Sequence, residues 1–471
     1  MSSSLLHPDR LFPANPELRT VARELYQNIK DLPIVSPHGH TDPSWFANNQ
    51  CFDNAADLLI KPDHYVFRML YSQGIALQDL GVPTADGSPT STDNRAIWRL
   101  FAKNYHLFAA TPSRMWIDHV LYQVFGFSER FTEASADKFY DEINRQLATD
   151  EFRPRALLDR FNIELIATTE GALDTLEHHA KIRADGWGHR VVTAYRPDNV
   201  VDPEFEGFLD NLKVFGELSG CDISTWEGYL NAHRNRRAFF KSMGATSTDH
   251  GHAKATTSNL SLEDAQALYQ VVLSGKATAE QADTFRGQVL TEMAGMSVED
   301  GLVMQLHPGS FRNHNQVVFD TFGRDKGADI PEQTEYVRAL KPLLDKYGNH
   351  PNFTLILFTL DETVYSRELA PLAGHYPCLR LGPPWWFHDS PEGMRRFRQQ
   401  ATETAGLYNT VGFNDDTRAF LSIPARHDVA RRMDCVSLAE WVADHRITMD
   451  EAHELAHELT YGLVKRAYKL G

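Results

Sequence analysis

Residues 32–40 read LPIVSPHGH, a short apolar run that ends in two histidines separated by one glycine. Such runs, when they alternate with helical patterns, indicate βα units around a parallel sheet. Eight parallel strands are the number that closes a barrel, whose chemistry lies just past the C-terminal ends of the strands. The sequence therefore predicts an α/β protein, a distorted (β/α)8 or TIM barrel. Seven later runs complete the set of eight: residues 163–170 (IELIATTE), 189–197 (HRVVTAYRP), 241–250 (KSMGATSTDH), 301–307 (GLVMQLH), 353–361 (FTLILFTLD), 379–386 (LRLGPPWW) and 410–416 (TVGFNDD).

The interval between the first and second strands is too long for a simple crossover, because loops of this length without structure of their own are uncommon. We predict that residues 1–40 and 163–471 form the barrel and that residues 41–162 form an inserted helical subdomain that caps it. Helical periodicity is present in residues 63–74 (DHYVFRMLYSQG), 94–108 (NRAIWRLFAKNYHLF) and 135–150 (SADKFYDEINRQLATD). A second long interval contains residues 261–275 (SLEDAQALYQVVLSG) and 278–293 (TAEQADTFRGQVLTEM), also predicted as helices.

Composition limits the class of protein. With 47 Lys and Arg against 63 Asp and Glu, the formal net charge is −16, and such a surface repels nucleic acids. The four cysteines form no C-x-x-C pair, which argues against a zinc-thiolate or redox site. The first 16 residues contain no apolar segment of the signal-peptide kind, and no run approaches the roughly 18 apolar residues of a membrane span. We expect a cytoplasmic enzyme that binds neither nucleic acid nor membrane.

The ends of the first and last strands carry the sharpest candidate for a metal site. His38 and His40 are two positions apart on a strand, so their imidazoles face the same side and can share a metal ion. Asp416 closes the eighth strand, which barrel closure places beside the first. His307, at the end of the fifth strand, is a possible further ligand, although a hydrogen-bonded core histidine is an equal alternative.

Arginines and tryptophans at the same strand ends suit a sugar acid. A guanidinium group matches the two oxygens of a carboxylate. Arg196 follows the third strand and Arg418 the eighth, and one or both are predicted to bind the carboxylate, with Arg312 as a weaker candidate. Trp385 and Trp386 end the seventh strand and can pack on the apolar side of a sugar.

The H-x-H pair on strand one with Asp416 on strand eight resembles the amidohydrolase superfamily. Seven further segments narrow the resemblance to the uronate isomerase (glucuronate isomerase) family, in the same order and at similar spacing, over nearly the whole chain. They are residues 63–75 (DHYVFRMLYSQGI), 168–179 (TTEGALDTLEHH), 195–198 (YRPD), 248–251 (TDHG), 305–315 (QLHPGSFRNHN), 381–389 (LGPPWWFHD) and 415–428 (DDTRAFLSIPARHD). Relatives read TTDDP for TTEGALD and TDSR for DDTR, and SIPARHD has one extra residue, changes that bear on substrate preference.

The resemblance implies an aldose-ketose isomerase that interconverts D-glucuronate and D-fructuronate, or D-galacturonate and D-tagaturonate. A proton would move from C2 to C1 through an enediol. Asp416 and Tyr65 are predicted to handle protons, with His64 as a further site residue from the cap. The expected cofactor is one divalent ion, zinc, loosely held and not strictly required, and the enzyme is expected to be a homo-oligomer.

Three alternatives remain open from the sequence. A metal-dependent hydrolase of the amidohydrolase superfamily would use the same ligands to activate water. A sugar-acid binding protein would keep the arginines and tryptophans but would not need the H-x-H pair. His453 to His457 also matches the H-E-x-x-H pattern of metalloproteases, but the apolar stripe of this helix predicts packing instead.

Overall fold

The computed structural model describes residues 5–471. Its main sheet has seven strands in the order β1-β2-β3-β4-β5-β8-β9, and every neighbouring pair is parallel. These strands confirm the first seven predicted runs. Their bounds are β1 Ile34–Ser36, β2 Ile163–Gly171, β3 Val191–Arg196, β4 Ser247–His250, β5 Val303–Leu306, β8 Leu355–Leu357 and β9 Leu379–Leu381.

The eighth predicted strand is wrong as a strand, although its position is right. Residues 410–416 form one parallel bridge, between Thr410 and Leu381 of β9. On the other side the backbone N–H of His40 donates to the carbonyl of Thr417 at 3.1 Å, so the segment lies between β9 and the loop after β1. Regular pairing is lost because Gly412 and Asp416 have φ angles of 78° and 40°, outside the extended region.

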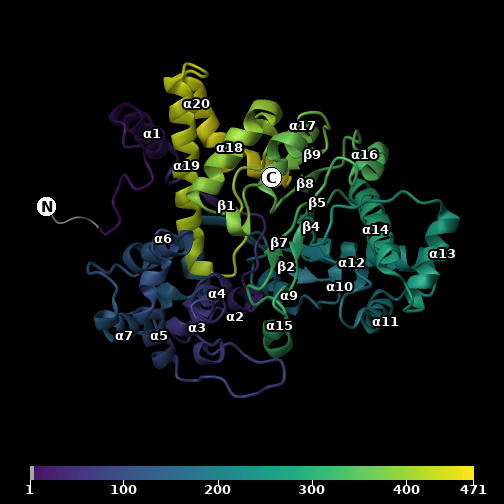
Figure 1. Ribbon diagram of the computed structural model, residues 1–471, viewed down its shortest axis with the longest axis horizontal. Coiled ribbons are helices and arrows are strands. Elements are labelled where there is room, and N and C mark those ends of the chain that lie inside the picture. The colour runs from purple at the N-terminus through teal and green to yellow at the C-terminus, as the bar shows by residue number, and fades with distance from the viewer. Residues whose placement is uncertain (1–4) are drawn as a thin grey trace.

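Between β1 and β2 the chain is helical, as predicted. The three predicted helices are present, and their buried positions recur at helical spacing: Phe139, Ile143 and Leu147 in α7, for example, are buried. Figure 1 shows α3 to α7 grouped beside the sheet, at the lower left. The helices are α2 Pro43–Asn48, α3 Ala55–Leu59, α4 His64–Ser72, α5 Asn94–Lys103, α6 Pro112–His119, α7 Ala136–Leu147 and α8 Pro154–Arg160.

The hydrophobic core of this helical region continues into the sheet. Its buried cluster includes Phe67 and Trp98 from the helices together with Ile163 and Ile166 of β2 and Phe420 from the C-terminal part. The region is thus packed on the barrel rather than tethered to it. The division into a barrel and a separate cap stays a prediction.

The remaining helices surround the sheet (Figure 1), and both helices predicted after β4 are present as α13 and α14. They are α1 Pro16–Ile29, α9 Glu177–Ala184, α10 Asp198–Val201, α11 Phe208–Ser219, α12 Trp226–Ser242, α13 Leu262–Leu273, α14 Ala279–Asp300, α15 Gln316–Phe322, α16 Lys341–Tyr347, α17 Ala370–Ala373, α18 Pro391–Ala405, α19 Ile423–Ala443, α20 Met449–His457 and α21 Leu463–Ala467. A two-stranded antiparallel pair, β6 Ser310–Phe311 with β7 Ile330–Pro331, was not predicted.

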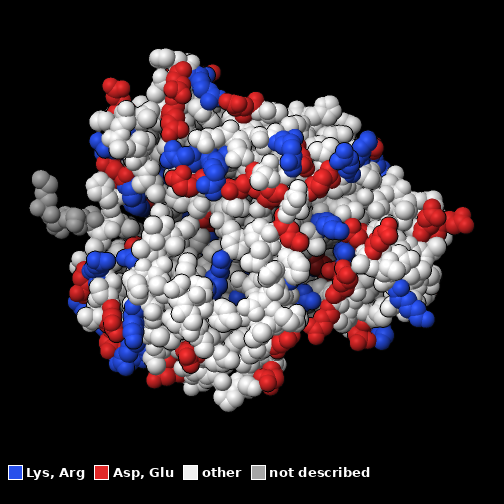
Figure 2. Space-filling view, in the orientation of Figure 1, with Lys and Arg blue, Asp and Glu red and all other residues white. Residues whose placement is uncertain are grey.

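The surface agrees with the composition. Figure 2 shows acidic and basic side chains interspersed over the described residues of the displayed face, without one extended basic patch. None of the helices in residues 5–471 combines the length and the apolar character needed to cross a membrane.

Candidate active site

One cavity of about 410 Å³ collects every side chain that the sequence predicted as a site residue. Its walls come from the C-terminal ends of β1 to β5, from the segments after β9 and around Asp416, from the loops that carry Arg312 and Asp325, and from the start of α4. The eleven predicted residues in its lining are His38, His40, His64, Tyr65, Arg196, His307, Arg312, Trp385, Trp386, Asp416 and Arg418.

Three side chains in this cavity form a donor set that could hold a metal ion. Ligand atoms of His38, His307 and Asp416 all lie within 4.8 Å of one another. His40 lies beside them, with its Nε2 3.2 Å from Asp416 Oδ1, and His38 Nε2 is 3.4 Å from the same oxygen. The rings of His38 and His307 are stacked at 4.7 Å. The structure therefore brings together the four residues that the sequence analysis proposed as ligands.

A second interaction orients His307. Its Nδ1 lies 2.7 Å from Asp249 Oδ1 in a hydrogen bond, which fixes the ring and turns Nε2 toward the cavity. His307 Nε2 is buried and has no hydrogen-bond partner among the described residues, while the buried Asp416 Oδ1 faces the Nε2 atoms of His38 and His40. A buried ring nitrogen without a partner, close to a carboxylate oxygen, suits a cation site. The donor set fits a divalent ion.

The ionisation of these groups also favours a cation. Burial raises the pKa of Asp416, but the neighbouring His38 and His40 lower it by a larger amount. The pKa of Asp416 therefore lies below its ordinary value. Burial lowers the pKa of His38 and of His40. The carboxyl group of Asp416 is therefore ionised near neutral pH, which is the form that binds a metal ion.

The helical region contributes one wall through the first turn of α4. Asp63 caps this helix by accepting a hydrogen bond from the backbone N–H of Tyr65 at 2.9 Å, which directs His64 and Tyr65 toward the cavity. The His64 ring stacks on Tyr65 at 4.8 Å and meets Trp386 edge to face at 5.3 Å. Burial raises the pKa of Tyr65 and lowers that of His64 to about 3, so both are neutral near pH 7.

A fully buried guanidinium group packs against the aromatic side chains of this wall. Arg426, at the start of α19, lies 3.5 Å from the centre of the Trp116 ring and 5.2 Å from that of Tyr65. It donates to Asp389, which is also buried. Because the aromatic rings pack against a fixed cation, the position of Tyr65 is set by the barrel as well as by its own helix.

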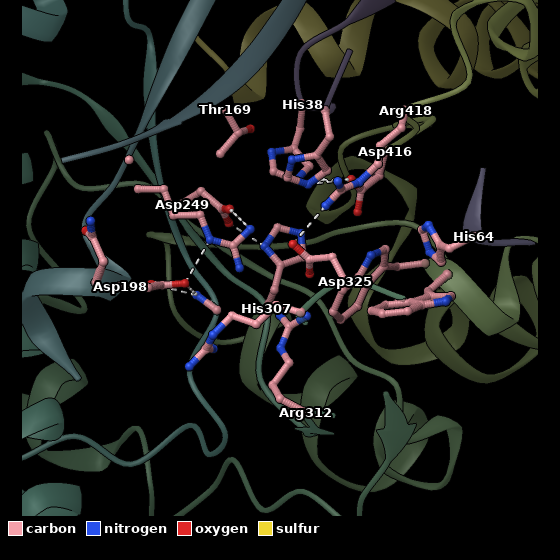
Figure 3. Close-up of a pocket in the computed structure, with 18 of the residues that line it drawn as sticks. His38, His64, Thr169, Asp198, Asp249, His307, Arg312, Asp325, Asp416 and Arg418 are labelled. Atoms are coloured by element: carbon pink, nitrogen blue, oxygen red, sulfur yellow. Dashed lines mark hydrogen bonds and ion pairs between the residues drawn. The ribbon is translucent and has the colours of Figure 1, made fainter. Parts of the chain in front are cut away.

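The three predicted carboxylate-binding arginines differ in how firmly they are already paired. Arg196 lies between Asp198 and Asp249, at 2.8 and 3.1 Å. Arg312 pairs with a buried aspartate, Asp329, at 2.7 Å. Arg418 pairs with Asp325 at 3.2 Å, and both side chains of this pair are partly exposed. Figure 3 shows Arg418 and Asp416 on one side of the cavity and Asp198 and Asp249 on the other.

Known proteins resemble this chain in both sequence and structure. The family model described as glucuronate isomerase matches residues 17–468. The chain belongs to the glucuronate isomerase family. A uronate isomerase from Xanthomonas campestris pv. campestris is 64% identical over 99% of both chains. The solved glucuronate isomerase of Caulobacter crescentus is 61% identical, with a TM-score of 0.97, and covers 99% of this chain and 98% of its own. The uronate isomerase of Thermotoga maritima is 28% identical, with a TM-score of 0.91 and coverage of 98% and 99%.

Membership of the glucuronate isomerase family identifies the chain as an enzyme of the isomerase class and favours this reading over the hydrolase alternative. The H-E-x-x-H segment has no part in the cavity. His453 contacts Asn28 and Glu24 of α1, while Ala452 and Ala456 on the same helix are buried in a hydrophobic cluster. The prediction that α20 is a packing helix is confirmed.

Four aspartates that line the cavity were not predicted as site residues from the sequence: Asp198, Asp202, Asp249 and Asp325. Asp249 is inside β4, one residue before the predicted strand end at His250. The alternation of side chains along a strand could have found it, because neighbouring residues point to opposite faces. Asp325 lies in the loop after α15, where no strand pattern marks it.

Proposed function

We propose that this enzyme interconverts D-glucuronate and D-fructuronate, and D-galacturonate and D-tagaturonate, by moving a proton from C2 to C1 through an enediol. The observation that carries the proposal is the meeting, in one cavity, of a His–Asp cluster and a neutral tyrosine with several guanidinium groups. The first two suit proton transfer at carbon, and the guanidinium groups suit a substrate carboxylate. The Xanthomonas relative is called a uronate isomerase, which supports the same reaction.

In this proposal His38, His307 and Asp416 hold one divalent ion, with His40 beside them. Nitrogen and oxygen donors suit several first-row ions, and zinc is the ion that we propose. A bound ion would polarise oxygen atoms of the substrate. Because a carboxylate that moves protons cannot also be a tight ligand, we propose that the ion is loosely held and not strictly required.

Asp416 is the proposed base at C2. Its Oδ1 atom faces the two imidazoles of the H-x-H pair, so Oδ2 is the oxygen that would accept the proton. The φ angles of Asp416 and Trp386 are 40° and 51°, a strained conformation that residues of active sites adopt more often than others.

Tyr65 is the proposed partner of the base. Its raised pKa keeps the phenol protonated, so it can donate a hydrogen bond to the oxygen that becomes negative in the enediolate. His64 is neutral near pH 7 and stacks on the Tyr65 ring, so its proposed role is to orient that ring. The two neutral groups would complement the ionised Asp416.

Arg418 is the arginine best suited to the substrate carboxylate, because its present partner is partly exposed. Arg196 and Arg312, each bound to a buried aspartate, would contribute positive potential or bind hydroxyl groups. Trp385 and Trp386 would pack against the apolar side of the sugar.

Incubation of the purified enzyme with D-glucuronate, coupled to reduction of the ketose by an NADH-dependent reductase, tests the proposal. Formation of ketose supports it. A protein that forms no ketose from either uronate, yet cleaves an ester or amide only when metal is present, would be the hydrolase instead. The same assay with D-galacturonate gives the substrate preference.

We further propose a cap, a cellular compartment and an oligomeric state for this enzyme. Residues 41–162 act as a cap, since they supply His64 and Tyr65 to the cavity. The enzyme works in the cytoplasm, for which the four free cysteines suit a reducing compartment. It is a homo-oligomer, which light scattering of the purified protein would test.

A further inference from the structure

A short loop between α15 and β7 lines the cavity, and three of its residues have positive φ angles. Gly323, Asp325 and Gly327 have φ angles of 77°, 60° and 70°. A side chain at Gly327 would come within 3.2 Å of the His64 carbonyl, so the loop is pressed against α4. A non-glycine residue in the left-handed region costs roughly 1 kcal/mol, and such strain gathers at functional sites.

The strained residue directs a carboxylate into the cavity. Asp325 Oδ2 is 3.2 Å from Arg418 Nη2, and Figure 3 shows the side chain between Arg418 and Arg312. Partial shielding from water raises the pKa of the exposed Asp325 carboxyl, but the charges of Arg418, Arg196 and Arg312 outweigh this effect and lower the pKa to about 2. A carboxylate of the protein thus occupies the positive field to which the proposed function assigns the carboxylate of the substrate.

The pair with Arg418 is the one that can open. Arg196 and Arg312 are paired with Asp249 and Asp329, whose side chains are 1% and 3% exposed. The Asp325 and Arg418 side chains are 54% and 40% exposed, and the loop has glycines on both sides. Ion pairs this exposed contribute little, so another carboxylate can replace Asp325 at small cost.

We propose that Asp325 is a specificity-determining residue that holds Arg418 until the carboxylate of the sugar acid takes its place. The inference rests on the proposed function, since it assumes a carboxylate substrate. Because one carboxylate replaces another at Arg418, this exchange by itself contributes little to the free energy of substrate binding. Contacts with the sugar hydroxyls then decide which anion binds, and small anions that lack hydroxyls are kept out of the site.

The test is the binding of three probes to the wild-type protein and to Asp325→Asn, measured by calorimetry. Asparagine has the same shape and tolerates positive φ, so the loop is preserved. The probes are D-glucuronate, acetate as a bare carboxylate, and glucitol as a neutral sugar alcohol. Asp320→Asn, an exposed position on α15, is the matched control for the loss of one negative charge.

We expect Asp325→Asn to bind D-glucuronate and acetate about twofold to fivefold more tightly, and to bind glucitol as the wild type does. The KM for D-glucuronate should fall by a similar factor. Weaker or unchanged binding of D-glucuronate would overturn the inference. Weaker binding would mean that Asp325 binds a hydroxyl group of the sugar, because removal of such a contact lowers the affinity. Equal effects in Asp320→Asn would also overturn the inference. Wild-type turnover, measured separately, tests the proposed function.

Discussion

Glu170 provides a pH test of the account of buried charge in this barrel. It lies on β2 with 7% of its surface exposed, accepts a hydrogen bond from the Thr193 hydroxyl, and has His179 3.8 Å away. Burial raises the pKa of its carboxyl from 4.5 to about 7. As the pH rises from about 4.5 to 7, the unfolded chain loses this proton while the folded protein keeps it, so stability must fall.

The difference between the ordinary pKa of 4.5 and the pKa of about 7 in the folded protein corresponds to about 3 kcal/mol of free energy of unfolding. Between about pH 5 and about pH 8, Glu170→Gln should therefore gain about 2.5 kcal/mol in free energy of unfolding relative to the wild type. Urea denaturation of both proteins at the two pH values measures the difference. Glu164→Gln is the control, because this glutamate on the same strand is bound at the surface by Lys465 and Tyr461. The reasoning would be refuted if the free energies of unfolding of the wild type and Glu170→Gln differed by the same amount at both pH values.

Three other predictions concern activity and stability. Asp416→Asn should lose at least about 100-fold in kcat with an unchanged circular dichroism spectrum, because the proposed base is removed; unchanged turnover would exclude that role. Arg418→Met should raise KM for D-glucuronate about tenfold and form the same ketose, and an unaltered KM would count against carboxylate binding. Arg426→Met should lower the free energy of unfolding by about 3–5 kcal/mol, since it leaves the buried Asp389 without its partner, and a loss below about 1 kcal/mol in urea denaturation would contradict this.

Most of the fold could be predicted because local pattern and tertiary structure agree. Runs such as residues 301–307 are apolar, short and bounded by polar residues. This pattern is typical of a strand that is buried on both faces of the sheet. Residues 410–416 have the same appearance, with Val411 and Phe413 buried, but the positive φ angles of Gly412 and Asp416 break the strand. Local propensity does not report a strained backbone that the surrounding structure imposes.

The candidate site could be predicted where a side chain follows a strand end. His38, Arg196 and His307 were found in this way, since parallel strands bring their C-terminal ends together. Asp416 was found because its segment lies beside β9, in the place of the expected eighth strand. Asp325 could not be found, because its place in the cavity depends on a loop whose path is set by contact with α4. Likewise, Arg426 reads in the sequence as one of several arginines on a long helix.

The most direct test of the central claim is the proton NMR spectrum of D-glucuronate incubated with the wild-type enzyme in D2O. The account predicts that signals of the ketose appear, and that the C2 proton signal of the remaining glucuronate decays as deuterium from the solvent replaces it. If neither change occurs, the claim that this cavity moves a proton between C2 and C1 of a uronate is contradicted.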